Sequence, residues 1–297
     1  MIMPTKIIDT HVHVWDLSKA EYPWLAGDTS LLNDTWKIES LEEERSLAGI
    51  TEGILVQAAG NKEDTDNMLQ VAADTDWISG VVIWLPLLDP AETQRQLEDN
   101  YLSNPYFCGV RHQVHDEPDP RWLLQQPVIE SLKILAAHSI PFDLVAVKTD
   151  HIRTALEVAA KVPELKMVFD HLSQPPIAAK LRFGQWGELM QEASAHSNFY
   201  AKISGLGTAS GNFKGWTKND LQSYVEFALK HFEYNRCFCG GDWPVSLLAG
   251  KYSAIWNAYR EILASLLTEK EQEQVLYHSA KDFYKIKTGH KETNTWK

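Results

Sequence analysis

The sequence lacks the features that mark secreted or membrane-spanning proteins. Its 297 residues include only three cysteines, Cys108, Cys237 and Cys239, and such an odd, sparse set is typical of free thiols in a reducing compartment. No apolar run approaches the ~20 residues that a membrane helix needs. We expect no cleaved leader, because no charged and apolar segment precedes the first expected strand. These absences predict a cytoplasmic protein.

Motifs of several common enzyme classes are also missing. There is no Gly-x-Ser-x-Gly segment of serine esterases, no Gly-x-x-x-x-Gly-Lys phosphate loop and no Gly-x-Gly-x-x-Gly dinucleotide loop. Positive charge is scarce, since 40 acidic residues outnumber 28 basic ones and leave a net charge of −12. That charge repels nucleic acids and anionic membrane surfaces, so we expect a small-molecule substrate and neither of those partners.

Eight short apolar segments alternate with longer amphipathic ones along the chain. This alternation predicts a parallel sheet covered by helices, and the length suits a (β/α)8 (TIM) barrel as a single domain over 1–297. We expect the barrel over about 6–286, with an extra C-terminal helix and a loose polar tail over 287–297. A doubly wound open sheet is the alternative. The expected strands are Ile7–Val14, Glu52–Ala58, Gly80–Leu85, Cys108–Val114, Pro141–Val147, Lys166–Leu172, Phe199–Gly205 and Cys237–Asp242.

Capping side chains and prolines mark the expected helix starts between these strands. A Ser-x-x-Glu capping box is expected at Ser40. The other expected starts are at Asn61, Asp89–Pro90, Pro127, Thr217 and Thr268, the last opening the extra helix that runs to about Ile286.

The first expected strand ends in His11-Val12-His13. Side chains alternate between the two faces of a strand, so both imidazoles are expected on one face, together with Asp9. Paired imidazoles at a strand end can ligate a divalent metal or polarise an oxygen. The alternative is a pair of histidines with ordinary hydrogen bonds.

Ionisable residues stand at the ends of five further expected strands. The C-terminal strand ends of a (β/α)8 barrel form one rim, so these side chains are expected to converge there. Burying so many polar groups is costly unless they pair with each other or act on a ligand. The alternatives are an ordinary ion pair between Arg111 and Asp143 and a lysine that only reaches solvent. The residues are Arg111 and His112 on the fourth strand, Asp143 on the fifth, Asp170 and His171 on the sixth, Lys202 on the seventh and Asp242 on the eighth; His115, His138, His151, His196, His231, His278 and His290 are expected to be ordinary.

On these residues the chain resembles the amidohydrolase superfamily, and more closely its branch of sugar-lactone hydrolases. A His-x-His on the first strand, a histidine ending the sixth and an aspartate ending the eighth carry the wider resemblance. Five blocks, in order over nearly the whole chain, carry the closer one. They are His11–Trp15, Gly109–His112, Phe169–Leu172, Lys202–Leu206 and Gly241–Pro244.

The resemblance implies a (β/α)8 barrel that hydrolyses a small lactone, such as an L-fuconolactone-like aldonolactone. It implies catalytic roles for His11, His13, Arg111, His171 and Asp242. Many superfamily members bridge two metals with a carboxylated lysine on the fourth strand, where this chain has Gly109–His112, so a binuclear centre is not expected. We expect no strict metal requirement, and a single Zn²⁺ held by His11, His13 and Asp242 is the alternative.

The expected mechanism gives each residue a task. Asp242 takes a proton from water and returns it to the leaving ring oxygen, while His171 and Arg111 hold the developing oxyanion. Other side chains are expected to bind the substrate. His112, Asp143 and Lys202 would hold its polar groups, and Trp15, Trp24 and Trp243 would form an apolar wall, unless the tryptophans only pack in the core.

Three other functions are alternatives for the same residues. A related decarboxylase would use one metal, although Asp143 stands where such enzymes carry a histidine. A hydrolase of a dicarboxylic lactone would use Arg111 and Lys202 for the second carboxylate. A barrel that only binds a sugar acid would not need two histidines beside an aspartate.

Overall fold

The computed structural model describes residues 6–286, and all eight expected strands form within them. The strands are parallel and are ordered around the sheet as they occur in the chain. The predicted tail over 287–297 lies outside the described residues. The strands are β1 Ile8–Val12, β2 Glu52–Val56, β3 Ile78–Ile83, β4 Phe107–His112, β5 Phe142–Leu144, β6 Met167–Phe169, β7 Phe199–Ile203 and β8 Cys237–Cys239.

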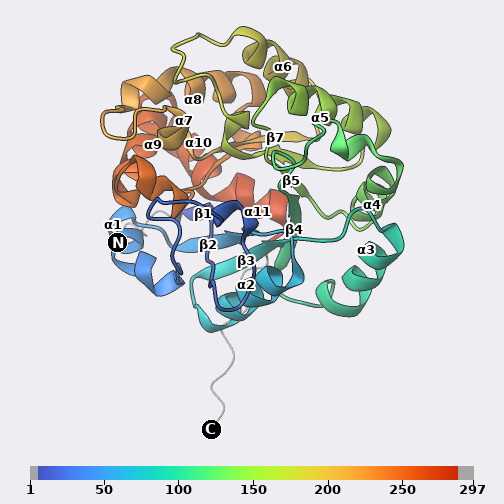
Figure 1. Cartoon of the computed structure of the whole chain (residues 1–297). Coiled ribbons are helices and arrows are strands. Elements are labelled where there is room, and N and C mark those ends of the chain that lie inside the picture. The colour runs from blue at the N-terminus through green and yellow to red at the C-terminus, as the bar shows by residue number, and fades with distance from the viewer. Residues whose placement is uncertain (1–5, 287–297) are drawn as a thin grey trace.

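The last strand returns to the first and closes the barrel. The backbone N–H of Asp242 donates to the carbonyl of His11, and the N–H of His13 donates to that of Trp243, each at 2.7 Å. The hydroxyl of Thr10 also donates to the carbonyl of Cys239, at 2.8 Å. These contacts nearly close the ring of eight strands, which excludes the doubly wound sheet and confirms the (β/α)8 barrel (Figure 1).

Helices surround this ring in chain order (Figure 1). None of the helices within 6–286 is long and apolar enough to cross a bilayer. The helices are α1 Glu42–Ala48, α2 Lys62–Asp74, α3 Pro90–Gln96, α4 Gln126–Ala137, α5 Thr149–Lys161, α6 Gly184–Ser194, α7 Leu206–Ala209, α8 Lys218–Phe232, α9 Tyr252–Leu266, α10 Glu269–Glu273 and α11 Ser279–Tyr284.

Most of the expected helix starts are confirmed. The side chains of Asn61 and Asp89 cap α2 and α3, and Thr217 and Thr268 form capping boxes. The box expected at Ser40 is wrong. A 3-10 turn over Ile38–Leu41 leads directly into α1, so Ser40 lies inside a turn and not at the first free N–H groups.

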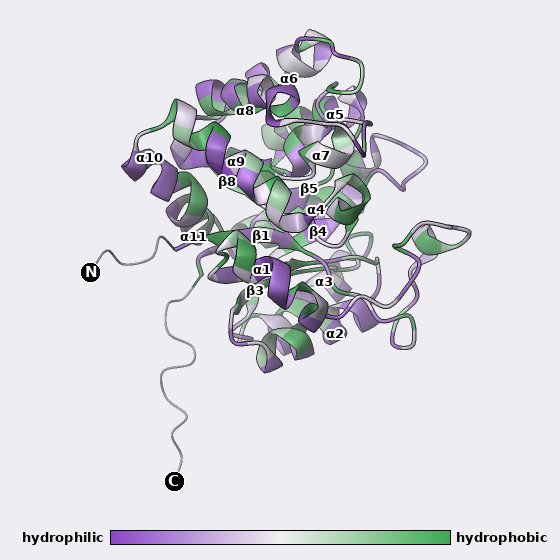
Figure 2. Ribbon diagram, turned by 90° about the vertical axis from the view of Figure 1, so that its left-hand side faces the viewer, coloured by the Kyte–Doolittle hydropathy of each residue, from purple (hydrophilic) through white to green (hydrophobic). Residues whose placement is uncertain are grey.

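The two largest apolar clusters lie on opposite sides of the strands. Outward-facing strand residues pack against the helices, and this layer buries the thiols of Cys237 and Cys239. Inward-facing residues such as Ile8, Val82 and Phe238 pack with Phe283 and other residues at the end of the chain. The predicted extra helix therefore ends in α11, which closes the barrel on the side away from the protruding loops (Figures 1 and 2).

Candidate active site

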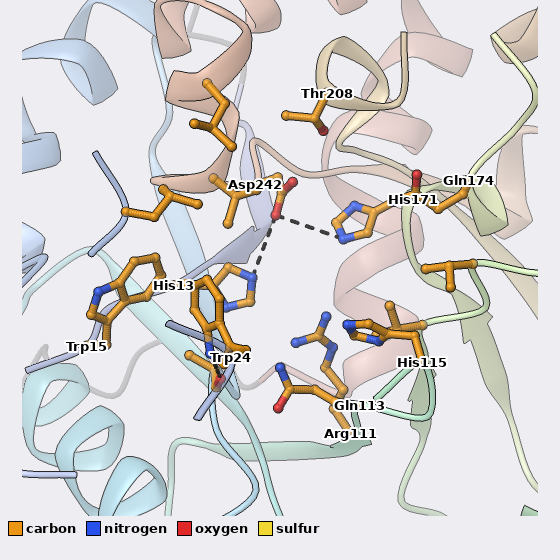
Figure 3. A pocket seen from close by; sticks show the side chains of 16 residues that line it. His13, Trp15, Trp24, Arg111, Gln113, His115, His171, Gln174, Thr208 and Asp242 are labelled. Carbon is orange, nitrogen blue, oxygen red and sulfur yellow. Dashed lines mark hydrogen bonds and ion pairs between the residues drawn. The ribbon is translucent and has the colours of Figure 1, made fainter. Parts of the chain in front are cut away.

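Three imidazoles surround one carboxylate oxygen at the open end of the barrel. The Nε2 atoms of His13, His11 and His171 lie 3.6, 3.8 and 3.9 Å from Oδ1 of Asp242. The rings of His11 and His171 are 4.5 Å apart, and those of His11 and His13 are 4.8 Å apart. Figure 3 shows Asp242 between His13 and His171. The convergence expected from the sequence is therefore present.

Asp9 does not share the face of the two histidines, contrary to the expectation. The register of β1 shifts between Asp9 and Val12, which breaks the simple alternation of side chains. The carboxylate of Asp9 instead accepts bonds from the N–H of Gly241, at 2.8 Å, and from the hydroxyl of Tyr252, at 2.5 Å. Burial raises the pKa of Asp9 to about 6. Asp9 therefore joins β1 to β8 and to α9.

The two glycines before Asp242 allow the close approach of β8 to β1. A Cβ on Gly240 would lie 2.6 Å from the Cβ of His11, and one on Gly241 would lie 2.2 Å from the ring of Tyr252. Asp242 itself has a left-handed backbone with φ of 57°. An aspartate tolerates this conformation better than most residues. The local backbone thus turns the carboxylate toward the imidazoles.

A left-handed turn after β6 positions His171. Four consecutive residues, from His171 to Gln174, have positive φ between 49° and 55°, a conformation that costs about 1–2 kcal/mol per residue. The Nδ1 atom of His171 lies 2.8 Å from Oγ of Ser204. Gly205 has φ of 60°, and a Cβ there would lie 2.6 Å from this Nδ1 atom. Strain of this kind collects at functional sites.

Below the imidazoles lies a fully buried network of charges. Nζ of Lys202 lies 2.6 Å from Oδ2 of Asp143 and 2.8 Å from Oδ1 of Asp170. Nε of Arg111 donates to Oδ2 of Asp170, at 3.1 Å, and the hydroxyl of Tyr284 donates to Asp143, at 2.7 Å. The network links α11 at the bottom of the barrel to the histidines at its top.

The electrostatics keep Asp170 and Lys202 charged and His11 and His171 neutral. Burial acts to raise the pKa of Asp170, but the charge of Lys202 and its other neighbours hold it well below its usual value. Burial likewise opposes the charge of Lys202, and Asp143 and Asp170 outweigh it and raise the pKa of the amine. Burial lowers the pKa of both His11 and His171. Each of these two imidazoles therefore has one nitrogen lone pair at neutral pH.

A cavity of about 330 Å³ opens above Asp242. Half of the residues that line it are polar and half are apolar, and Trp15 and Trp24 meet edge to face at 5.2 Å. Figure 3 shows Arg111, Gln113 and His115 on the side of the cavity opposite Asp242. The lining residues are His13, Trp15, Trp24, Leu32, Ala58, Arg111, Gln113, His115, Val145, Val147, His171, Gln174, Thr208, Asp242, Val245 and Leu248.

Four of the residues expected to bind substrate do not line this cavity. Asp143 and Lys202 are completely buried in the charge network. His112 alternates with Arg111 on β4, faces away from the cavity, and stacks on Trp122 with its Nε2 atom 2.7 Å from Glu117. Trp243 packs in the core, as the alternative for the tryptophans stated. These four side chains are therefore not among the groups that face this cavity.

Several cavity residues carry no signal in the sequence. His115 was expected to be ordinary, and Gln113, Gln174 and Thr208 belong to no motif, yet all four line the cavity. Loop residues that lie far apart in sequence meet only when the barrel closes. For Gln113 one partner is visible in the structure, since Nε2 of Gln57 donates to its Oε1 atom, at 3.2 Å.

The residues fit a single divalent cation. His11, His171 and Asp242 offer ligand atoms that all lie within 4.8 Å of one another. Nε2 of His11 is buried and has no hydrogen-bond partner in the part of the chain that the structure describes. Imidazole nitrogens and a carboxylate oxygen suit Zn²⁺. His171 thus joins the expected set of His11, His13 and Asp242, while His13 places a further nitrogen beside Asp242.

Active sites of (β/α)8 barrel enzymes lie at the C-terminal ends of the strands, where this chain has its cluster of imidazoles and a carboxylate. The fold and the site therefore place the chain in the class of (β/α)8 barrel enzymes. This chain belongs to the amidohydrolase family, whose model matches residues 8–286. It is 30% identical to L-fucono-1,5-lactonase of Burkholderia ambifaria over 286 residues, which are 94% of this chain and 95% of that protein.

Solved structures share the fold of this chain. A crystal structure of an amidohydrolase from Burkholderia multivorans with bound HEPES is 25% identical, has a TM-score of 0.86, and covers 95% of this chain and 100% of that one. A second structure of an amidohydrolase from the same organism, with bound zinc, is 24% identical with the same TM-score and the same coverage.

The buried lysine yields a stability prediction. Replacing Lys202 with Met leaves two buried carboxylates without their shared counter-ion, so we expect the free energy of unfolding to fall by about 3–5 kcal/mol. The matched control is Lys218→Met, which breaks the surface ion pair with Glu261, 2.7 Å long, and should cost less than about 1 kcal/mol. Urea denaturation measures both. Equal losses in the two variants would contradict the assigned charge network.

Proposed function

We propose that this protein is a lactonase that opens a sugar lactone by attack of water on its carbonyl carbon. The observation that carries the proposal is the group of three imidazoles around the Asp242 carboxylate, at the floor of a cavity that is half apolar. A base, neutral imidazoles and a guanidinium on one wall are what ester hydrolysis requires.

In this mechanism Asp242 acts as the general base. Its carboxylate takes a proton from the attacking water, the water oxygen bonds to the carbonyl carbon, and the bond to the ring oxygen then breaks. The same carboxyl group returns the proton to the departing ring oxygen. Arg111 and His171 stabilise the negative oxygen of the intermediate. Ser204 supports His171 through the contact of its hydroxyl with Nδ1, and when this hydroxyl donates, the hydrogen of the neutral ring lies on Nε2, toward the cavity.

The cavity favours a neutral, hydroxylated ring over a dicarboxylic lactone. Among its described lining residues Arg111 is the only one with a permanent positive charge, and its Nε and Nη1 atoms already bind Asp170 and the carbonyl of Gln57. Lys202 is buried below and does not reach a second carboxylate. Trp15 and Trp24 offer flat apolar surface to a sugar ring, and Gln113, Gln174 and Thr208 offer hydrogen bonds to its hydroxyls.

A divalent cation would be held by His11, His171 and Asp242, with His13 beside it. When bound, it would polarise the carbonyl as a Lewis acid. We propose that turnover does not strictly depend on it, because a lactone is an activated ester, and Asp242, Arg111 and His171 supply a base and oxyanion donors by themselves.

The proposal is tested with a panel of aldono-1,4- and 1,5-lactones, in which acid release is followed with a pH indicator. We expect hydrolysis of at least one sugar lactone, and a loss of about 100- to 10,000-fold in kcat for Asp242→Asn, because the amide cannot accept the proton. Asp99→Asn, at an exposed position in the turn Leu97–Tyr101 after α3, is the control and should keep full activity. Near-normal turnover by Asp242→Asn would reject the assigned base, and release of CO2 from aromatic acids without lactone hydrolysis would reject the function.

A matched pair of glycine variants tests the positioning of His171. Gly205→Ala places a methyl group 2.6 Å from Nδ1 of His171 and should lower kcat about 100-fold. Gly184→Ala is the control, since Gly184 also has positive φ, 47°, but nothing lies within 4 Å of the added methyl. The control measures the effect on kcat of an alanine in a left-handed backbone conformation, without a contact to His171. An equal loss of kcat in both variants would remove the role of His171 from the mechanism.

Metal removal gives a further expected outcome. After dialysis against a chelator, and with zinc measured by atomic emission, we expect kcat within about tenfold of the untreated enzyme, because the loss of even one oxyanion donor typically costs ~100-fold or more. A larger loss that added Zn²⁺ restores would show that the Lewis acid is required.

A further inference from the structure

Lys202 lies against the back of His11, on the side away from the cavity. Nζ of Lys202 is 3.2 Å from Nδ1 of His11, and both side chains are fully buried. The network described above holds the lysine in place through Asp143 and Asp170. The mechanism leaves this contact unused, although it touches one of the three imidazoles directly.

The ammonium group has three hydrogens and three acceptor atoms around it. These atoms are Oδ2 of Asp143 at 2.6 Å, Oδ1 of Asp170 at 2.8 Å and Nδ1 of His11 at 3.2 Å. On another side the ammonium faces the rings of Tyr284 and Phe238, which attract a cation but offer it no lone pair. Oδ1 of Asp170 has no hydrogen-bond partner among the described residues, so its contact with the ammonium is an ion pair. The ammonium can donate to Nδ1 of His11 only if that nitrogen is an acceptor.

We propose that Lys202 is a positioning residue that holds His11 in the tautomer with its hydrogen on Nε2. The alternative tautomer would direct an Nδ1 hydrogen at the ammonium, and it would have to reach Oδ1 of Asp170 over 3.5 Å. The hydrogen on Nε2 then points into the site beside Asp242, where Nε2 has no hydrogen-bond partner within residues 6–286. On the proposed function, this N–H is a further donor to the carbonyl oxygen of the lactone.

The same tautomer opposes metal binding. A cation at Nε2 needs the lone pair of that nitrogen, so binding would force the hydrogen onto Nδ1, where it meets the Lys202 ammonium. In metal sites the group behind a ligating histidine is usually an acceptor, and changing that group alters metal affinity by about 10- to 100-fold. Here a donor occupies the position, so the site has the ligands for a cation and a charge behind them that weakens its binding.

The first experiment reads the tautomer in metal-free wild-type protein. Long-range 1H–15N spectra of protein with 15N-labelled histidine distinguish a hydrogen on Nδ1 from one on Nε2, and the His11→Asn variant assigns the His11 signals among the eleven histidines. We expect the hydrogen on Nε2. A hydrogen on Nδ1 overturns the proposal, and this result requires no variant of Lys202.

The second experiment measures zinc affinity by competition with a chromophoric chelator. The double variant Lys202→Met/Asp143→Asn removes one charge of each sign, and we expect it to bind Zn²⁺ about 10- to 100-fold more tightly than the wild type. Lys218→Met is the control and should leave the affinity unchanged, while Asp242→Asn should weaken binding and so locate the ion. Equal or weaker zinc binding by the double variant would overturn the proposal. Neither experiment uses a substrate, so a failure of the lactonase proposal remains distinguishable.

Discussion

The contact between the first and the last strand is the constraint on which the site depends. Two backbone hydrogen bonds of 2.7 Å, from Asp242 to His11 and from His13 to Trp243, set the register of this seam. A slip of one residue would turn the side chains to opposite faces. Asp9 secures the register from behind, because its carboxylate binds the N–H of Gly241. Closing the barrel and bringing Asp242 beside the three imidazoles are therefore one event.

The buried charges extend this constraint through the barrel. Each ion in the network loses its water on folding, and the loss is offset only because Lys202, Asp143, Asp170 and Arg111 satisfy one another. The chain of contacts begins at Tyr284 on α11 and ends at the histidines. Helix α11 at the bottom of the barrel is thus connected to the histidines at its top. The same buried ions that cost free energy on folding also orient His11.

Much of this arrangement could be predicted from the sequence, because strand periodicity and topology determine which residues reach the rim. The eight strands and the convergence of His11, His171 and Asp242 were predicted on that basis. The direction in which a side chain points from its strand was harder to predict from the sequence. The irregularity in β1 turns Asp9 away from the histidines, and the depth of Lys202 in the barrel depends on partners from three other elements. Cavity residues in loops, such as His115, are not marked by a periodic pattern in the sequence. Only the folded structure shows that they line the cavity.

Three histidine side chains surround Asp242, and they differ in the groups that their Nδ1 atoms contact. Nδ1 of His13 donates to the carbonyl of Val56, at 2.7 Å, which leaves the lone pair of a neutral ring on Nε2. Nδ1 of His171 meets a hydroxyl, which can donate or accept. Nδ1 of His11 meets an ammonium, which can only donate. The three imidazoles around one carboxylate therefore have different surroundings, an asymmetry that suits the proposed transfer of a proton from water to the leaving ring oxygen.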